Sequence, residues 1–131
     1  MLKVKSIMVR NVITADKNLT LEEAIDLLYK KHIGSLVIVD KNNKCLGIFT
    51  ERDAIKCIAQ KIPLTKPLKE HMTTRVLTIN ENASFDEARM MINEHRIRHL
   101  PVINDEQVLV GLFSLREVLD EFFGIEHQHS I

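Results

Sequence analysis

The sequence repeats itself, and this repeat limits the folds that the chain can adopt. A shift of 64 residues aligns the chain with itself, without gaps, from about residue 7 to residue 119. The identical pairs are spread over this whole range and include Met8/Met72, Val12/Val76, Thr14/Thr78, Asn18/Asn82, Glu23/Glu87, Ala24/Ala88, Ile33/Ile97, Leu36/Leu100, Gly47/Gly111, Phe49/Phe113 and Arg52/Arg116. Two copies are too few for a solenoid, so we predict two repeats related by a pseudo-two-fold axis and packed through their sheets.

Each copy predicts the same order of elements, which is strand, helix, strand, strand and helix. Short apolar runs bounded by turn residues predict strands at residues 12–14, 36–39 and 45–49, and again at 76–79, 100–103 and 108–113. The first helix of each copy opens with a capping-box pattern, Thr20–Glu23 or Ser84–Glu87, and is predicted to end near His32 or Glu94. In the first copy, Leu21, Ala24, Ile25 and Leu28 have helical spacing and predict an apolar stripe that faces the core. The predicted fold class is therefore α/β, of the α+β kind, with the unit β-α-β-β-α present twice.

A linker with two prolines, residues 62–67, separates the copies. We therefore predict repeat one at residues 1–64 and repeat two at residues 65–131. Pro67 suits the first turn of a short helix that ends near Met72. Residues 124–131 have no periodic pattern, and we expect this tail to fray.

The composition excludes several classes of function. Lys plus Arg and Asp plus Glu number 18 each, so no net field attracts nucleic acid or an anionic membrane. No run approaches the roughly 18 apolar residues of a membrane span, and charged residues interrupt the N-terminus where a signal peptide would be apolar. Cys45 and Cys57 lack Cys-x-x-Cys spacing and are expected to be free thiols. We predict a cytoplasmic protein without a nucleic-acid or membrane partner.

The most informative motif is a strand that runs directly into a helix, and it occurs in both copies. The strand at residues 45–49 ends at Thr50, and Asp53 lies one turn into the next helix. Such a junction offers a hydroxyl and free backbone N–H groups for phosphate, and a carboxylate for the paired hydroxyls of a ribose. Ser114 and Glu117 take the equivalent positions in the second copy. The alternative for Asp53 is a carboxylate that only complements the helix dipole.

The doubled unit, which ends each time in Gly-x-x-(Ser/Thr)-x-x-(Asp/Glu), resembles the CBS (cystathionine β-synthase) domain. These domains occur in tandem as a Bateman module, and the resemblance covers about residues 5–122. It implies a regulatory sensor that binds AMP, ADP, ATP or S-adenosylmethionine in clefts between the repeats. It also implies a homodimer in the form of a flat disc, an effector protein that the sequence does not identify, and no required cofactor.

The resemblance places the better ligand site at the first junction. Asp53 would hold the ribose hydroxyls, and Thr50 would lie along the sugar and phosphate. Residues of the second copy's first predicted strand would border the adenine, and three cationic groups would favour a phosphorylated adenosine. The implied residues are Thr50, Asp53, Val76, Leu77, Thr78, Arg98, His99, Pro101 and Arg116. The alternative for Arg98 and His99 is the solvated end of a strand.

A second, symmetry-related cleft is implied by Ile13, Thr14, Gly34, Ser35, Ser114 and Glu117. Gly34 and Ser35 carry no charge where the first site has Arg98 and His99. Glu117 has a longer side chain than Asp53, its counterpart in the first site. We therefore expect this cleft to be weaker or empty, which leaves one good site per chain.

Two rival functions remain open: a structural dimerisation module with empty clefts, and a sensor of S-adenosylmethionine. An enzyme is not predicted, because no Ser-His-Asp set, metal-ligand cluster or phosphate loop has suitable spacing. His127 and His129 form a His-x-His pair without a third ligand, so no metal site is predicted.

Overall fold

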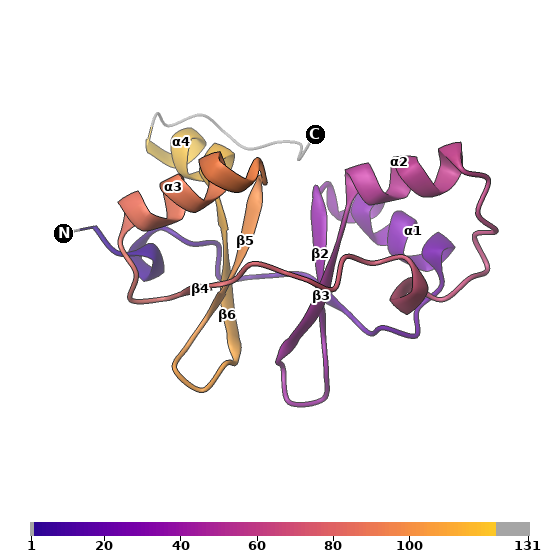
Figure 1. The fold of residues 1–131 in the computed structure, drawn as a ribbon, viewed down its shortest axis with the longest axis horizontal. Coiled ribbons are helices and arrows are strands. Elements are labelled where there is room, and N and C mark those ends of the chain that lie inside the picture. Colours follow the sequence, from indigo (N-terminus) through magenta and orange to yellow (C-terminus); the bar gives the residue numbers. More distant parts are fainter. Residues whose placement is uncertain (1, 123–131) are drawn as a thin grey trace. The chain divides into compact units, whose positions relative to one another are not determined.

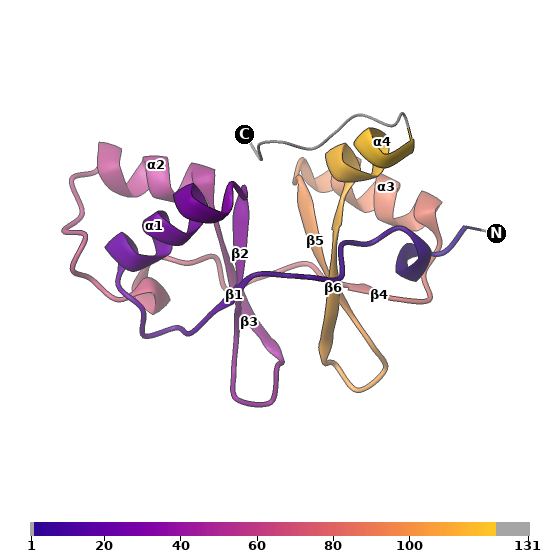
Figure 2. The ribbon, with the colours of Figure 1, turned by 180° about the vertical axis from the view of Figure 1, so that it is seen from behind.

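The computed structural model describes residues 2–122, except the side chains of residues 117 and 120–122. Within this range the chain forms two compact units. The central unit consists of residues 13–76, and the terminal unit consists of residues 2–12 together with residues 77–122. Each unit contains a three-stranded sheet and two α-helices of its own (Figures 1 and 2).

The central unit is built on a sheet with the strand order β1–β2–β3. β1 pairs with β2 in parallel, and β2 pairs with β3 in antiparallel. The parallel pair needs a crossover connection, which α1 supplies. α1 and α2 lie on the same side of this sheet (Figure 1). The elements in chain order are β1 (Thr14–Ala15), α1 (Leu21–Lys31), β2 (Ser35–Val39), β3 (Cys45–Thr50), α2 (Glu51–Ala59) and the 3₁₀ helix η2 (Leu68–Glu70).

The terminal unit repeats this arrangement. β4 pairs with β5 in parallel, and β5 pairs with β6 in antiparallel. Its elements are the 3₁₀ helix η1 (Val4–Ser6), β4 (Ile79–Asn80), α3 (Phe85–His95), β5 (His99–Ile103), β6 (Leu109–Ser114) and α4 (Leu115–Phe122). The prediction of two β-α-β-β-α repeats is therefore confirmed, and their packing through the sheets stays a prediction.

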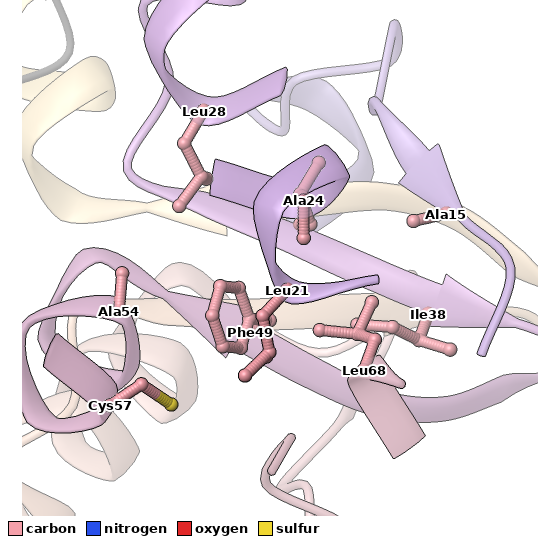
Figure 3. Packing of buried hydrophobic residues seen from close by; sticks show 10 residues of the cluster. Ala15, Leu21, Ala24, Leu28, Ile38, Phe49, Ala54, Cys57 and Leu68 are labelled. Atoms are coloured by element: carbon pink, nitrogen blue, oxygen red, sulfur yellow. The ribbon is translucent and has the colours of Figure 1, made fainter. Parts of the chain in front are cut away.

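The core of the central unit lies between its sheet and its helices. Leu21, Ala24 and Leu28 form the buried stripe of α1, at the spacing that the sequence predicts. They belong to one cluster with the fully buried ring of Phe49 from β3 (Figure 3). Burial of such a ring contributes roughly 1.5–3 kcal/mol. Leu68 of η2 is also fully buried in this cluster, so the linker segment completes the core of the unit.

One of the two predicted capping boxes forms in full. At α1, Thr20 Oγ1 accepts a bond of 3.1 Å from the N–H of Glu23, and Glu23 Oε1 accepts one of 3.0 Å from the N–H of Thr20. At α3 only half of the predicted capping box forms. Ser84 Oγ accepts a bond of 3.1 Å from the N–H of Glu87, but the Glu87 carboxylate does not accept one from the N–H of Ser84. A carboxylate in the first turn still complements the helix dipole there.

The segment before each repeat's first strand packs in the unit of the other repeat. Thr73 and Ile48 exchange two backbone hydrogen bonds of 2.9 Å in the central unit. Val9 and Leu112 form the same pair in the terminal unit, where Figure 2 shows the N-terminal segment beside β6. The compact units are consequently not the stretches 1–64 and 65–131 of the sequence repeat.

Two glycines permit these close crossings. A Cβ atom at Gly47 would lie 2.8 Å from the carbonyl oxygen of Thr73 and 2.9 Å from Sδ of Met72. A Cβ atom at Gly111 would meet the side chain of Met8 in the same way. The identical pairs Met8/Met72 and Gly47/Gly111 of the sequence repeat are therefore contact partners, one pair in each unit.

Several boundaries differ from the prediction. The first strand of each copy is two residues long and begins later than expected, at Thr14 and Ile79. The predicted helix after Pro67 is a short 3₁₀ turn, and its counterpart η1 was not predicted because it precedes the aligned range. The predicted fraying of residues 124–131 lies outside the described residues.

Candidate functional site

At the β3–α2 junction a strand runs directly into a helix, as the motif predicts. Thr50 has extended backbone angles and caps α2, and it forms a complete capping box with Asp53. Asp53 Oδ2 accepts hydrogen bonds of 2.9 Å from the Thr50 N–H and 3.1 Å from the Thr50 hydroxyl. The Thr50 hydroxyl in turn accepts a bond of 3.2 Å from the N–H of Asp53. The carboxylate of Asp53 is half-buried and held on one side.

Most of the first-turn N–H groups of α2 are already bonded. Glu51 donates to the carbonyl oxygen of Gly34 at 3.0 Å, and Asp53 donates to Thr50. The N–H of Arg52 has no partner in the described part of the chain. The sequence predicted a set of free donors for phosphate, and the junction instead leaves one free N–H and the second oxygen of Asp53.

Ser35 lies directly beside this junction. The register of β2 and β3 pairs Ser35 with Thr50, so their side chains lie on the same face of the sheet. Ser35 is only 5% exposed, and its hydroxyl has no hydrogen-bond partner among the described residues. A buried hydroxyl without a partner costs free energy, which requires an explanation such as a ligand or ordered water.

The terminal unit has the corresponding arrangement with different side chains. The register of β5 and β6 pairs His99 with Ser114. Burial, and then the positive charge of Arg98, lower the pKa of His99 from 6.5 to about 4. His99 is therefore a neutral donor and acceptor at pH 7, and the predicted group of three cations contains two, Arg98 and Arg116. Both arginines are exposed, and Arg116 already has an interaction partner.

Within each unit, these strand registers bring together residues that were predicted for two different clefts. Gly34 and Ser35, predicted for the weaker cleft, adjoin Thr50 and therefore Asp53. His99, predicted for the main cleft, adjoins Ser114 of the other cleft.

The remaining predicted residues lie around the first strand of each unit, on β5 and in α4. Ile13 precedes β1, Thr14 opens it, and Val76 ends the central unit. Leu77 and Thr78 precede β4, and Pro101 is fully buried on β5. The side chain of Glu117 lies outside the described residues. A cleft that combines residues of both units stays a prediction.

A pocket of about 240 Å³ adjoins the junction within the central unit. One wall is the face of α2 that begins at Asp53, and the other is the segment that follows η2. The lining residues are Asp53, Lys56, Cys57, Gln60, Glu70, His71, Met72 and Thr73. Apart from Asp53, sequence reasoning missed these residues, although their spacing from Asp53 along α2 could have identified its face. Burial, and then the charge of Asp53, raise the pKa of the Cys57 thiol, so this thiol is not a reactive nucleophile.

The described residues form neither a metal-binding group nor a membrane-crossing helix. No set of three His, Cys, Asp or Glu side chains converges there in a way that could hold a metal ion. None of the described helices is both long and apolar enough to cross a bilayer. The pair His127 and His129 lies outside this range.

Comparisons with known proteins match this arrangement. The family profile of the CBS domain matches residues 4–60 and again residues 68–124. The chain is similar to inosine-5'-monophosphate dehydrogenase of Methanocaldococcus jannaschii, with 34% identity over 117 residues that cover 89% of this chain and 23% of that enzyme. It is also similar to the CBS domain-containing protein YhcV of Bacillus subtilis, with 32% identity over 119 residues, 90% of this chain and 84% of that protein.

A solved structure is similar over nearly the whole chain. It is the CBS domain pair of protein MJ0100, in complex with 5'-methylthioadenosine and S-adenosyl-L-methionine. The TM-score is 0.85 and the sequence identity is 32%, with 96% of this chain and 99% of that chain covered. The chain thus spans the whole of one domain pair but less than a quarter of the dehydrogenase.

Proposed function

The chain belongs to the CBS-domain family, and on that premise we propose that this regulatory ligand-binding module senses an adenine nucleotide, such as AMP, ADP or ATP. The ligand would bind between the two repeats and change their arrangement or that of a homodimer. An effector protein would then read the changed surface. A ligand shifts such an equilibrium only by its differential affinity for the two states, so the sensor needs two arrangements.

The observation that carries the proposal is the carboxylate of Asp53. One of its oxygens is held by Thr50, and the other has no hydrogen bond in the described part of the chain. Asp53 also borders the pocket of the central unit. A half-buried carboxylate with a free acceptor suits the vicinal hydroxyls of a ribose, because hydrogen bonds to a charged acceptor are strong.

The phosphate would be held by the remaining polar groups of the predicted site. Arg98 and Arg116 are the cations, and Arg can bind phosphate through two parallel hydrogen bonds. His99 would act as a neutral donor. Ser35 joins this proposed site, because its unsatisfied hydroxyl lies beside Thr50.

Two alternatives have support of their own. The complex of MJ0100 contains adenosyl compounds without phosphate, which favours an S-adenosylmethionine sensor. A dimerisation module is favoured by the outer face of α2, where Ile55 is 66% exposed and Ile58 is 59% exposed. We expect this face to contact a second copy in either case. The proposal further places the protein in the cytoplasm and includes no catalytic step.

The test is calorimetric titration with AMP, ADP, ATP and S-adenosylmethionine, on the wild-type protein and on Asp53→Ala. We expect a phosphorylated adenosine to bind near one per chain, and the variant to bind it at least about tenfold more weakly. Glu23→Ala is the matched control, because it removes the equivalent capping-box carboxylate of α1. No heat with any of the four ligands, from protein shown to carry no co-purified nucleotide, would favour the dimerisation module.

A further inference from the structure

We propose that Thr50 is a positioning residue for Asp53 and does not itself bind the phosphate of the ligand. This inference rests on the proposed function, because it assigns Asp53 to the ribose. It changes the role that the family resemblance implies for Thr50, which is a contact along the sugar and phosphate.

The hydrogen-bond capacity of the hydroxyl supports this role. A threonine hydroxyl has one proton to donate. At Thr50 this proton goes to Asp53 Oδ2 at 3.1 Å, and the hydroxyl oxygen of Thr50 accepts the N–H of Asp53 at 3.2 Å. A phosphate oxygen accepts hydrogen bonds and cannot donate one when fully ionised. Thr50 can therefore serve a phosphate only by releasing the carboxylate of Asp53.

The same bonds determine which oxygen of Asp53 meets a ligand. Oδ2 receives two bonds, from the N–H and the hydroxyl of Thr50. These bonds stop the rotation of the carboxylate about its last torsion, which is otherwise a broad one. Oδ1 is then presented in one orientation, with both lone pairs available to sugar hydroxyls. A group that is oriented before binding loses less entropy when the ligand arrives.

The first helix of the same unit provides an internal control. Thr20 and Glu23 form the same box at α1, with bonds of 3.0 Å from the N–H and 3.0 Å from the hydroxyl to one carboxylate oxygen. That box is not part of the proposed site. Removal of the Thr20 hydroxyl should therefore produce the loss of helix stability alone.

The experiment measures the affinities of adenosine and AMP for the wild type, Thr50→Val, Thr50→Ser and Thr20→Val, with the thermal midpoint of each variant. If Thr50 acts through Asp53, Thr50→Val weakens adenosine and AMP by the same factor, roughly five- to tenfold. Thr50→Ser, which keeps both bonds, restores the affinity. Thr20→Val lowers the thermal midpoint to a similar extent and leaves both affinities unchanged.

Two other outcomes separate this proposal from the proposed function. If Thr50→Val weakens AMP and leaves adenosine unchanged, Thr50 contacts the phosphate and the positioning role is wrong. If Thr50→Val leaves both affinities unchanged, the positioning role is again wrong while the nucleotide sensor stands. Absence of AMP and adenosine binding by the wild type overturns the proposed function and this inference with it.

Discussion

The β3–α2 junction of the central unit and the β6–α4 junction of the terminal unit share one backbone arrangement and differ in their polar side chains. In each unit the residue that opens the hairpin pairs with the last residue of the second strand, Ser35 with Thr50 and His99 with Ser114. Ser35 is a buried hydroxyl without a partner, and His99 is an imidazole kept neutral by its surroundings. The two repeats therefore share one backbone arrangement and differ in the polar side chains at equivalent positions of their junctions.

The largest expected effect on stability comes from the two glycines, and its size should differ between the units. In Gly47→Ala the new methyl group meets the carbonyl oxygen of Thr73, a residue whose backbone is held by two hydrogen bonds with Ile48. We expect a loss of about 2–3 kcal/mol in the free energy of unfolding, measured by chemical denaturation. In Gly111→Ala the two nearest atoms belong to the Met8 side chain, and the nearest backbone atom, the carbonyl oxygen of Val9, is farther away at 3.0 Å. The loss should therefore be about 1 kcal/mol smaller.

A second substitution tests this explanation. Met8→Ala should relieve part of the strain of Gly111→Ala, because it removes the atoms nearest to the new methyl group. Met72→Ala should relieve Gly47→Ala less, because the backbone of Thr73 stays in place. Equal losses in the two glycine variants would contradict the distinction between a rigid and a flexible neighbour.

The pH dependence of stability should be specific to the terminal unit. The pKa of His99 is lowered to about 4 in the folded protein, whereas an unfolded histidine titrates near 6.5. Between these values the unfolded chain binds a proton that the folded chain does not. Stability is thus complete above pH 6.5 and falls as the pH decreases toward 4, by about 2 kcal/mol at pH 5.

The substitution His99→Ser introduces the residue that the central unit has at this position. It should remove most of this pH dependence in denaturation curves recorded between pH 7 and pH 5. His95→Ser, at an exposed histidine of α3, serves as the control and should keep the dependence. An unchanged slope in His99→Ser would show that another group is responsible.

The smallest effect is expected at Ser35. Ser35→Ala removes a buried hydroxyl that has no partner, so it should stabilise the ligand-free protein by up to about 1 kcal/mol, as measured by thermal unfolding. The same substitution should weaken AMP binding if the hydroxyl serves the ligand. A destabilised variant would indicate that the hydroxyl is satisfied in solution by an ordered water.

The local features of the fold were predictable because they depend on neighbouring residues. The stripe of Leu21, Ala24 and Leu28 and the Thr20–Glu23 box lie within single helices, and the structure confirms both. The crossing of Met8 over Gly111 was not predicted. It joins positions at opposite ends of the chain, and nothing in a local pattern indicates which unit the N-terminal segment joins.

The sequence predicts candidate site residues, which stay a prediction, but it does not predict how the strand registers group them within each unit. Counting outward from the predicted turn at residues 40–44 pairs Ser35 with Phe49. A β-bulge between Ile38 and Val39 shifts the register by one residue and pairs Ser35 with Thr50 instead. Such a shift exchanges the two faces of a strand, so it decides which side chains can meet. The neutral state of His99 depends on burial, which the sequence does not report.

The segment before each repeat's first strand, which packs in the unit of the other repeat, makes the two repeats depend on each other. Residues 65–76 complete the unit that contains repeat one, and residues 2–12, their counterparts under the shift of 64, complete the unit that contains repeat two. A cut at the repeat boundary would therefore remove Met72 from Gly47 and Met8 from Gly111 at once. Each unit is completed by a segment from the other copy, so a recombination event that separates the copies would leave both units incomplete.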